Sequence, residues 1–155
     1  MINIGFFGEG DSKLSKFVEG QIWKALNSLS SDTCLSFREI KVEDEEKHLS
    51  EGIIRYQKLD GCFSGLGRTE SNRISIGQGC HSIPIIKHET FHTLGFLHEQ
   101  SRADRDEYVQ VHYENIRKKN HGQFWQMNED QWVDQDVVYD YGSVMQYGGY
   151  SFSKG

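Results

Sequence analysis

The chain has 155 residues, of which 36% are hydrophobic and 12% aromatic, so it is long enough and apolar enough to fold as one domain with its own core. Its 17 basic and 23 acidic residues give a net charge of -6, which argues against a nucleic-acid surface or an anionic membrane as its partner. No apolar stretch approaches the length of a transmembrane helix, so we expect no membrane insertion.

The first residues of the chain show a strand pattern followed by a helix pattern. Residues 2–7 predict a short strand, and Asp11 or Ser12 is expected to cap a helix that runs to about residue 30. The apolar residues of this helix recur at helical spacing and are assigned to the core: Leu14, Phe17, Val18, Ile22, Leu26 and Leu29.

Three further strands are predicted where apolar and polar side chains alternate, at residues 35–42, 52–57 and 73–76. The Gly- and Ser-rich residues 60–67 are expected to form a loop, and the acidic run from Glu43 to Glu46 a solvated loop.

The chain changes character after residue 98. The later sequence is polar and irregular, and only residues 109–112 are predicted to form a short strand. We therefore expect an α+β fold in a single domain over residues 1–155, with a sheet-and-helix lobe at 1–98 and an irregular lobe at 99–155.

Residues 88–98 carry the pattern H-E-x-x-H-x-x-G-x-x-H on a helix expected to begin near Ile83. On an α-helix, His88 and His92 lie about 40° apart on one face and one turn apart in height, so their imidazoles can share one metal ion. Glu89 lies on the flank of the same face, beside the metal and not on it.

Gly95 explains how His98 can join the other two histidines. A continuous helix would point His98 away from the metal, about 240° round from His92. Glycine accepts the left-handed conformation that ends helices, so the chain can turn back at Gly95. Three neutral imidazoles leave Zn²⁺ its full charge and an open position for water, which is the layout of a catalytic zinc site. The histidines outside this motif are expected to have no role in it: His48, His81, His112 and His121.

The three cysteines are Cys34, Cys62 and Cys80, and they contain no C-x-x-C pair. Cys62 and Cys80 flank a Gly- and Ser-rich segment, like the two ends of a disulfide-closed loop. Cys34 is then either a buried free thiol or paired with a cysteine beyond residue 155, and we favour the second. Although no basic segment or cleavage site follows Met1, this cysteine usage favours part of a secreted, extracellular protein.

A second motif, YGSVMQY at residues 141–147, follows about fifty residues after the histidine motif. A methionine-bearing turn after the long zinc motif marks the metzincins. HETFHTLGFLHEQSRADRDEYV together with YGSVMQYGGYSFS resembles the astacin family of zinc endopeptidases. The resemblance covers most of the chain and is densest at residues 80–117 and 139–153.

The resemblance implies a fold and a reaction. The fold is a metzincin-like (zincin) catalytic domain, in which a twisted mixed β-sheet with a backing helix and an active-site helix precedes an irregular C-terminal lobe. The reaction is zinc-dependent hydrolysis of peptide bonds, with one catalytic Zn²⁺ and a protein or peptide as the substrate. A propeptide or a protein inhibitor is a candidate partner.

The resemblance also implies roles for individual residues. The zinc ligands would be His88, His92 and His98, with Tyr147 as an additional ligand that swings away during catalysis and serves as a catalytic residue. Glu89 would be the general base, Met145 the hydrophobic floor under the metal, and Glu99 a buried partner of the mature N-terminus. Cys62 and Cys80 match a family disulfide. An extended substrate is expected to pair with an edge strand near residues 73–76.

The sequence departs from the family in three places. Gln146 replaces the histidine common at its position, the chain starts later than a mature member, and about a quarter of the domain is expected beyond residue 155. Three alternatives stay open: a module that binds peptides without cleaving them, a structural zinc site with Tyr147 as fourth ligand, and another zincin class. Glu89 argues against the first two, and the extension from Gly95 to His98 argues against the third.

Overall fold

The structure is a computed structural model that describes residues 1–69, 71–132 and 136–155. It consists of two compact units, Met1–Phe96 and Leu97–Gly155. The predicted single catalytic domain, with lobes dividing at residue 98, remains a prediction about domain organisation.

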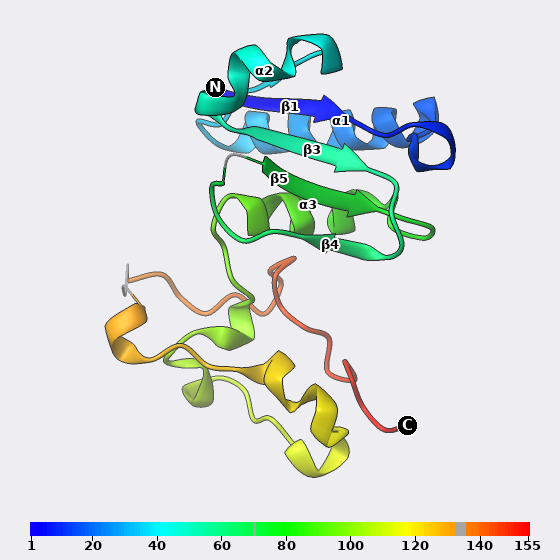
Figure 1. Ribbon diagram of the computed structural model, residues 1–155. Helices are drawn as coiled ribbons and strands as arrows, with labels where there is room; N and C mark the ends of the chain where they lie inside the picture. The colour runs from blue at the N-terminus through cyan, green and yellow to red at the C-terminus, as the bar shows by residue number, and fades with distance from the viewer. Residues whose placement is uncertain (70, 133–135) are drawn as a thin grey trace. The chain divides into compact units, whose positions relative to one another are not determined.

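The first unit is built on a five-stranded mixed sheet (Figure 1). Its strands are β1 (Ile2–Phe6), β2 (Phe37–Glu39), β3 (Ile53–Gln57), β4 (Cys62–Ser64) and β5 (Ser71–Ile76), in the order β2-β1-β3-β5-β4. Neighbouring strands are parallel except for β4, which runs antiparallel to β5 at one edge. The prediction that residues 73–76 form the edge strand was wrong, because β5 lies between β3 and β4.

Two helices, α1 (Lys16–Asp32) and α3 (Ile83–Thr93), lie side by side behind the sheet (Figure 1). Pro84 occupies the first turn of α3, where a proline needs no amide hydrogen bond. Ser15 caps α1, since its Oγ accepts a hydrogen bond from the amide of Val18 at 3.3 Å. The prediction of Asp11 or Ser12 as the cap was wrong, because Gly10–Ser12 forms a separate 3₁₀ turn before the helix.

The core of the first unit fills the space between the helices and the sheet. Fully buried residues come from β1, α1, β3, β5 and α3: Ile4, Ile22, Leu26, Tyr56, Ile74 and Ile86. Phe17 was wrongly assigned to this core. It is 64% exposed and packs edge-on against the ring of His81, because it lies off the helix face that meets the sheet.

Two segments of the first unit differ from the loops predicted for them. β4 lies within the predicted loop 60–67, because pairing with β5 makes a strand of a Gly- and Ser-rich segment with little strand signal of its own. The acidic run includes a 3₁₀ turn, Val42–Asp44, and continues into the short helix α2 (Glu45–His48). Glu45 forms an ion pair with buried Arg55, so part of this run is structural and not solvated.

The second unit consists of short 3₁₀ turns joined by irregular segments. Its buried residues include Ile116, Phe124, Tyr139 and Met145. Buried Arg105 donates hydrogen bonds to the carbonyl oxygens of Gln100 and Phe124 and so ties distant turns together. An irregular lobe was predicted, and it is confirmed.

The short strand predicted at residues 109–112 is wrong. In the part of the chain that the structure describes, these residues form no strand, and the amide of Val109 donates to the nearby carbonyl of Arg105 instead of to a neighbouring strand. None of the helices in the described ranges is long and apolar enough to cross a membrane.

The cysteine predictions are partly confirmed. Cys62 and Cys80 form a disulfide with a Sγ–Sγ distance of 2.02 Å, which ties the start of β4 to the segment before α3. Cys34 is free and exposed, so the alternative of a buried thiol was wrong. A disulfide partner for Cys34 stays a prediction.

Candidate metal centre

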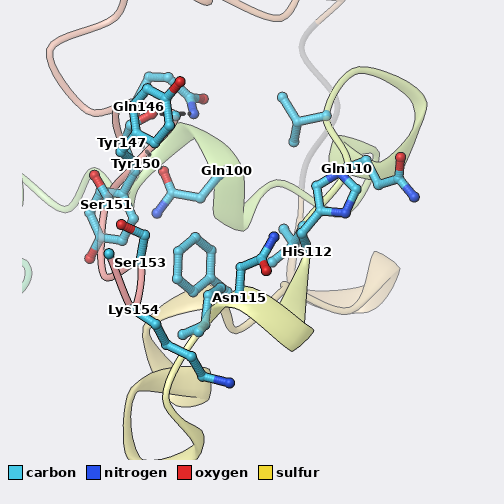
Figure 2. Close-up of a pocket in the computed structure, with 17 residues that line it drawn as sticks. Gln100, Gln110, His112, Asn115, Gln146, Tyr147, Tyr150, Ser151, Ser153 and Lys154 are labelled. Atoms are coloured by element: carbon cyan, nitrogen blue, oxygen red, sulfur yellow. Dashed lines mark hydrogen bonds between the residues drawn. The ribbon is translucent and has the colours of Figure 1, made fainter.

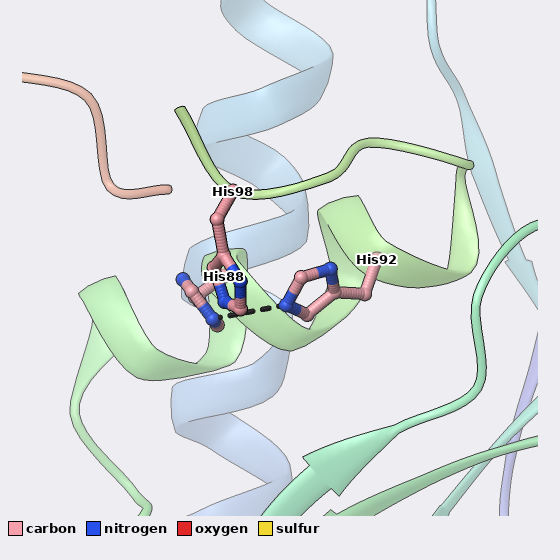
Figure 3. A group of neighbouring side chains, drawn as sticks. All are labelled: His88, His92 and His98. Atoms are coloured by element: carbon pink, nitrogen blue, oxygen red, sulfur yellow. Dashed lines mark hydrogen bonds between the residues drawn. The ribbon is translucent and has the colours of Figure 1, made fainter. Parts of the chain in front are cut away.

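Helix α3 presents two imidazoles from one face, as the spacing predicts. His88 and His92 lie one turn apart, with their Nε2 atoms 3.1 Å from each other (Figure 3). The opposite side of the helix is mostly apolar and faces the core: Ile86 and Thr90 are fully buried, and Ile83 and Leu94 are half-buried. The buried back fixes the helix and leaves the histidine face outward.

The end of α3 also fixes the orientation of His92. Gly95 has a φ of +99°, and the amides of Gly95 and Phe96 donate to the carbonyls of His92 and Phe91. These two bonds form a Schellman motif, and the rings of Phe91 and Phe96 pack 5.2 Å apart as its hydrophobic contact. The predicted helix stop at Gly95 is therefore confirmed.

This turn brings the carbonyl oxygen of Phe96 to within 2.8 Å of His92 Nδ1. A carbonyl only accepts hydrogen bonds, so Nδ1 of the neutral ring carries the proton and Nε2 keeps its lone pair. Burial lowers the pKa of His92 below its ordinary value, and the nearby His88 adds to this, while the bond to Phe96 and the charge of Glu89 act in the opposite direction. The ring has the tautomer and the neutral state that a metal ligand needs.

Glu89 lies between the two histidine positions on α3 and is buried, with 6% of its surface exposed. Its Oε2 accepts a hydrogen bond of 2.8 Å from the hydroxyl of Ser64 on β4. A buried carboxylate needs such a partner, because burial without one is costly. Sequence reasoning missed Ser64, because the contact joins two elements whose pairing the local pattern does not reveal.

The second unit contains the other predicted site residues. His98 precedes a 3₁₀ turn, Glu99–Ser101, and the amide of Glu99 donates to the carbonyl of Met145 at 3.0 Å. This hydrogen bond holds the methionine-bearing segment directly beside Glu99, the residue that follows His98. The side chain of Met145 is buried. A place for Met145 beneath a metal stays a prediction.

Glu99 is only half-buried, although it was predicted to be buried. Its Oε1 accepts hydrogen bonds from the guanidinium of Arg102 at 3.1 Å and from the amide of Asp140 at 3.0 Å. The carboxylate is therefore shared between two segments of the second unit. A role in meeting a mature N-terminus stays a prediction.

Tyr147 belongs to a cluster of aromatic rings in the second unit. Its ring lies 4.4 Å from that of His98, 5.6 Å from that of Phe124 and 5.4 Å from that of Phe152. Its amide donates to the side-chain oxygen of buried Gln100 at 3.1 Å. The structure thus brings together His98 and Tyr147, which the sequence placed in two separate motifs.

Beside this cluster is a cavity of about 690 Å³ in the second unit. Figure 2 shows Gln100, Asn115, Tyr147 and Ser153 among the side chains that line it. Tyr147 is half-buried and lines this cavity, so its side chain is not fully enclosed by the protein.

The histidine motif supplies one group of possible metal ligands. His88, His92 and His98 each offer one ring nitrogen, and these nitrogens lie within 4.8 Å of one another (Figure 3). Two nitrogens bound to one tetrahedral zinc, each at about 2.05 Å, stand about 3.3 Å apart. The 3.1 Å between Nε2 of His88 and Nε2 of His92 is close to that value. The donor set therefore fits zinc.

Comparison with known proteins identifies relatives of this arrangement. The sequence matches the peptidase family described as Astacin over residues 8–155. It is 41% identical to zinc metalloproteinase dpy-31 of Caenorhabditis elegans over 133 residues, which are 84% of this chain. It is 36% identical to meprin A subunit alpha of Mus musculus over 137 residues, which are 88% of this chain.

A solved structure agrees with these matches. High choriolytic enzyme 1, a hatching enzyme zinc-protease from Oryzias latipes, superposes with a TM-score of 0.82 at 32% identity, covering 99% of this chain and 72% of that one. The chain spans 22% of the length of the nematode proteinase and 17% of the mouse subunit. The predicted metzincin-like fold is confirmed by the hatching enzyme.

Proposed function

This chain belongs to the astacin family of peptidases, and on that premise we propose that it is a zinc-dependent endopeptidase acting on extended protein or peptide substrates. One observation carries the proposal. Helix α3 presents the paired Nε2 atoms of His88 and His92 next to the buried carboxylate of Glu89. A purely structural zinc site has no use for a carboxylate held beside its ligands.

The family and its zinc metalloproteinase relatives imply one catalytic zinc ion. We propose His88, His92 and His98 as its ligands and Tyr147 as an additional, displaceable one. The ring of Tyr147 packs on that of His98, which supports the last assignment. When bound, zinc acts as a Lewis acid that makes water acidic near neutral pH and polarises the scissile carbonyl.

Glu89 is the proposed general base and acid. Its carboxylate accepts a proton from the attacking water and delivers that proton to the nitrogen of the leaving amine, so the charge on Glu89 is restored in each cycle. A position beside the histidine face of α3 suits this role, and burial keeps bulk water from competing for the proton. Tyr147 is proposed to donate a hydrogen bond from its hydroxyl to the developing oxyanion.

The substrate is proposed to bind along β4, the antiparallel edge of the sheet, in place of the interior strand β5. An added strand makes main-chain hydrogen bonds with an open edge, which grips a peptide with little dependence on its sequence. Phe63 of β4 is 46% exposed and is available for contact with substrate side chains.

A secreted, extracellular location is part of the proposal. The Cys62–Cys80 disulfide supports it, because disulfides persist in oxidising compartments. Protein inhibitors and a propeptide belong to the same proposal as partners that would occupy the substrate site.

The test is cleavage of a quenched fluorescent peptide by the zinc-loaded chain, with and without a chelator, beside a Glu89→Gln variant. We expect chelator-sensitive cleavage that is lost in Glu89→Gln, while the variant still binds one equivalent of zinc. A folded, zinc-loaded chain that binds peptides without cleaving them would instead indicate a binding module. Normal turnover by Glu89→Gln would rule out the base assignment.

A further inference from the structure

We propose that Ser64 is a positioning residue that holds the Glu89 carboxylate for proton transfer and links it to the strand that receives the substrate. This inference rests on the proposed peptidase function. It concerns a hydroxyl on β4 and a carboxylate on α3, which are 25 residues apart in the sequence and joined by one hydrogen bond.

The hydrogen bond restricts Glu89 to one orientation. Ser64 Oγ donates to Glu89 Oε2 at 2.8 Å, and hydrogen bonds to a charged carboxylate are stronger than those between neutral groups. The hydroxyl uses one lone pair of Oε2, and Oε1 remains available for proton transfer. A carboxylate without this contact would sample several rotamers, and only some of them would place an oxygen beside the attacking water.

The main chain of Ser64 lies on the open side of the sheet. In the ladder between β4 and β5, the amide of Gly65 donates to the carbonyl of Arg73, and that of Gly77 to the carbonyl of Gly61. Bonded and non-bonded positions alternate along an antiparallel pair. The main chain of Phe63, two residues from both Gly61 and Gly65, therefore faces β5, and that of Ser64 faces away.

One residue thus has two contacts with different purposes. A peptide added to β4 would bond to the main chain of Ser64, whose side chain already holds Glu89. The disulfide from Cys62 to Cys80 anchors the same strand to the segment before α3, so the distance between strand and helix is fixed before substrate arrives. A supported, preorganised group needs little rearrangement during the reaction.

The activity test compares Ser64→Ala with Ser64→Thr, which keeps a hydroxyl at the same carbon. We expect Ser64→Ala to lower kcat roughly tenfold with less than about a twofold change in KM, and Ser64→Thr to recover most of the loss. Zinc content should equal that of the parent chain. Ser75→Ala is the matched control: it removes a hydroxyl from neighbouring β5 that donates to the carbonyl of Gly61, and it should leave kcat unchanged.

A second measurement does not depend on turnover. In the metal-free chain, urea unfolding of Ser64→Ala, Glu89→Ala and the double variant forms a double-mutant cycle, in which alanine removes the acceptor that glutamine would keep. We expect non-additive midpoints, because each single change already breaks the same hydrogen bond. Additive midpoints, or an active chain whose kcat is unaffected by Ser64→Ala, would overturn the positioning role alone. A parent chain without peptidase activity would overturn the proposed function as well.

Discussion

The carbonyl oxygen of Phe96 lies 2.8 Å from Nδ1 of His92, four residues earlier in the chain. This contact exists because the helix stops at Gly95 in a Schellman turn, which reverses the chain and aims the carbonyl at the imidazole. The outward partner of a ligating histidine fixes its tautomer and its ring orientation. The glycine of the motif therefore serves His92 as well as the chain that leads to His98.

The first prediction concerns Gly95→Ala. A Cβ at this position has room, since the nearest atom is Cα of Gly67 at 4.0 Å, but a φ of +99° is unfavourable for alanine. We expect a stability loss of about 1–2 kcal/mol and a roughly tenfold loss of zinc affinity, because the helix end and the Phe96 carbonyl move together. Competition with a fluorescent chelator measures the affinity.

Gly79→Ala is the matched control for this variant. Gly79 has a φ of +85° and open space around its Cβ position, but it lies outside the turn that contacts His92. It should lower stability by a similar amount and leave zinc affinity unchanged. An equal loss of zinc affinity in both variants would show that backbone strain, and not the Phe96 contact, weakens the site.

The second prediction is the pH dependence of zinc binding. Protons and zinc compete for the imidazole nitrogens, so affinity falls once the ligands protonate. Burial lowers the pKa of His92 from its ordinary 6.5, so this ring stays neutral to a lower pH than an exposed histidine does. Protons therefore begin to displace zinc from His92 only at that lower pH. We expect one bound zinc at pH 7.5 and its release below about pH 6. Metal analysis after dialysis at each pH measures the bound zinc.

The variants for this measurement are His92→Gln and His112→Gln. His112 is an exposed histidine of the second unit that contacts Glu114. His92→Gln should lose zinc at neutral pH, whereas His112→Gln should retain it with the same pH dependence. Loss of zinc in both variants would contradict the ligand assignment.

The sequence predicted those parts of the site that depend on local geometry. Helical spacing predicts the helix from Ile83 and places His88 and His92 on one face of it. The conformational freedom of glycine predicts the end of the helix at Gly95. These features need no knowledge of distant residues. The same reasoning failed for Phe17, whose helical spacing matches the core residues although its side chain is exposed, because spacing alone does not show how wide the buried face is.

The features that sequence reasoning missed are set by contacts across the fold. Ser64 meets Glu89 only because β4 pairs antiparallel with β5 and lies beside α3. The segment around it reads as a loop, since a three-residue strand rich in small residues has no clear alternation. A serine two residues after a disulfide cysteine was the available signal, but it did not identify the carboxylate partner.

The third prediction concerns the disulfide. Replacing Cys62 and Cys80 together with serine opens a loop closed over a sequence separation of 18 residues, and we expect a loss of about 3 kcal/mol in the free energy of unfolding, measured with urea. Cys34→Ser is the control, because this cysteine is free and exposed and should change stability by less than about 0.5 kcal/mol. Equal effects would mean that the bridge adds nothing to stability.

The fourth prediction separates the hydroxyl of Tyr147 from its ring. Tyr147→Phe keeps the aromatic packing against His98, Phe124 and Phe152, so the fold of the second unit and zinc content should be unchanged. If the hydroxyl stabilises the oxyanion, kcat should fall about a hundredfold with little change in KM. Tyr141→Phe removes an exposed hydroxyl that donates to the carbonyl of Tyr108 and should retain full activity. Full activity in Tyr147→Phe would show that the hydroxyl has no role in catalysis and that this tyrosine contributes only the packing of its ring.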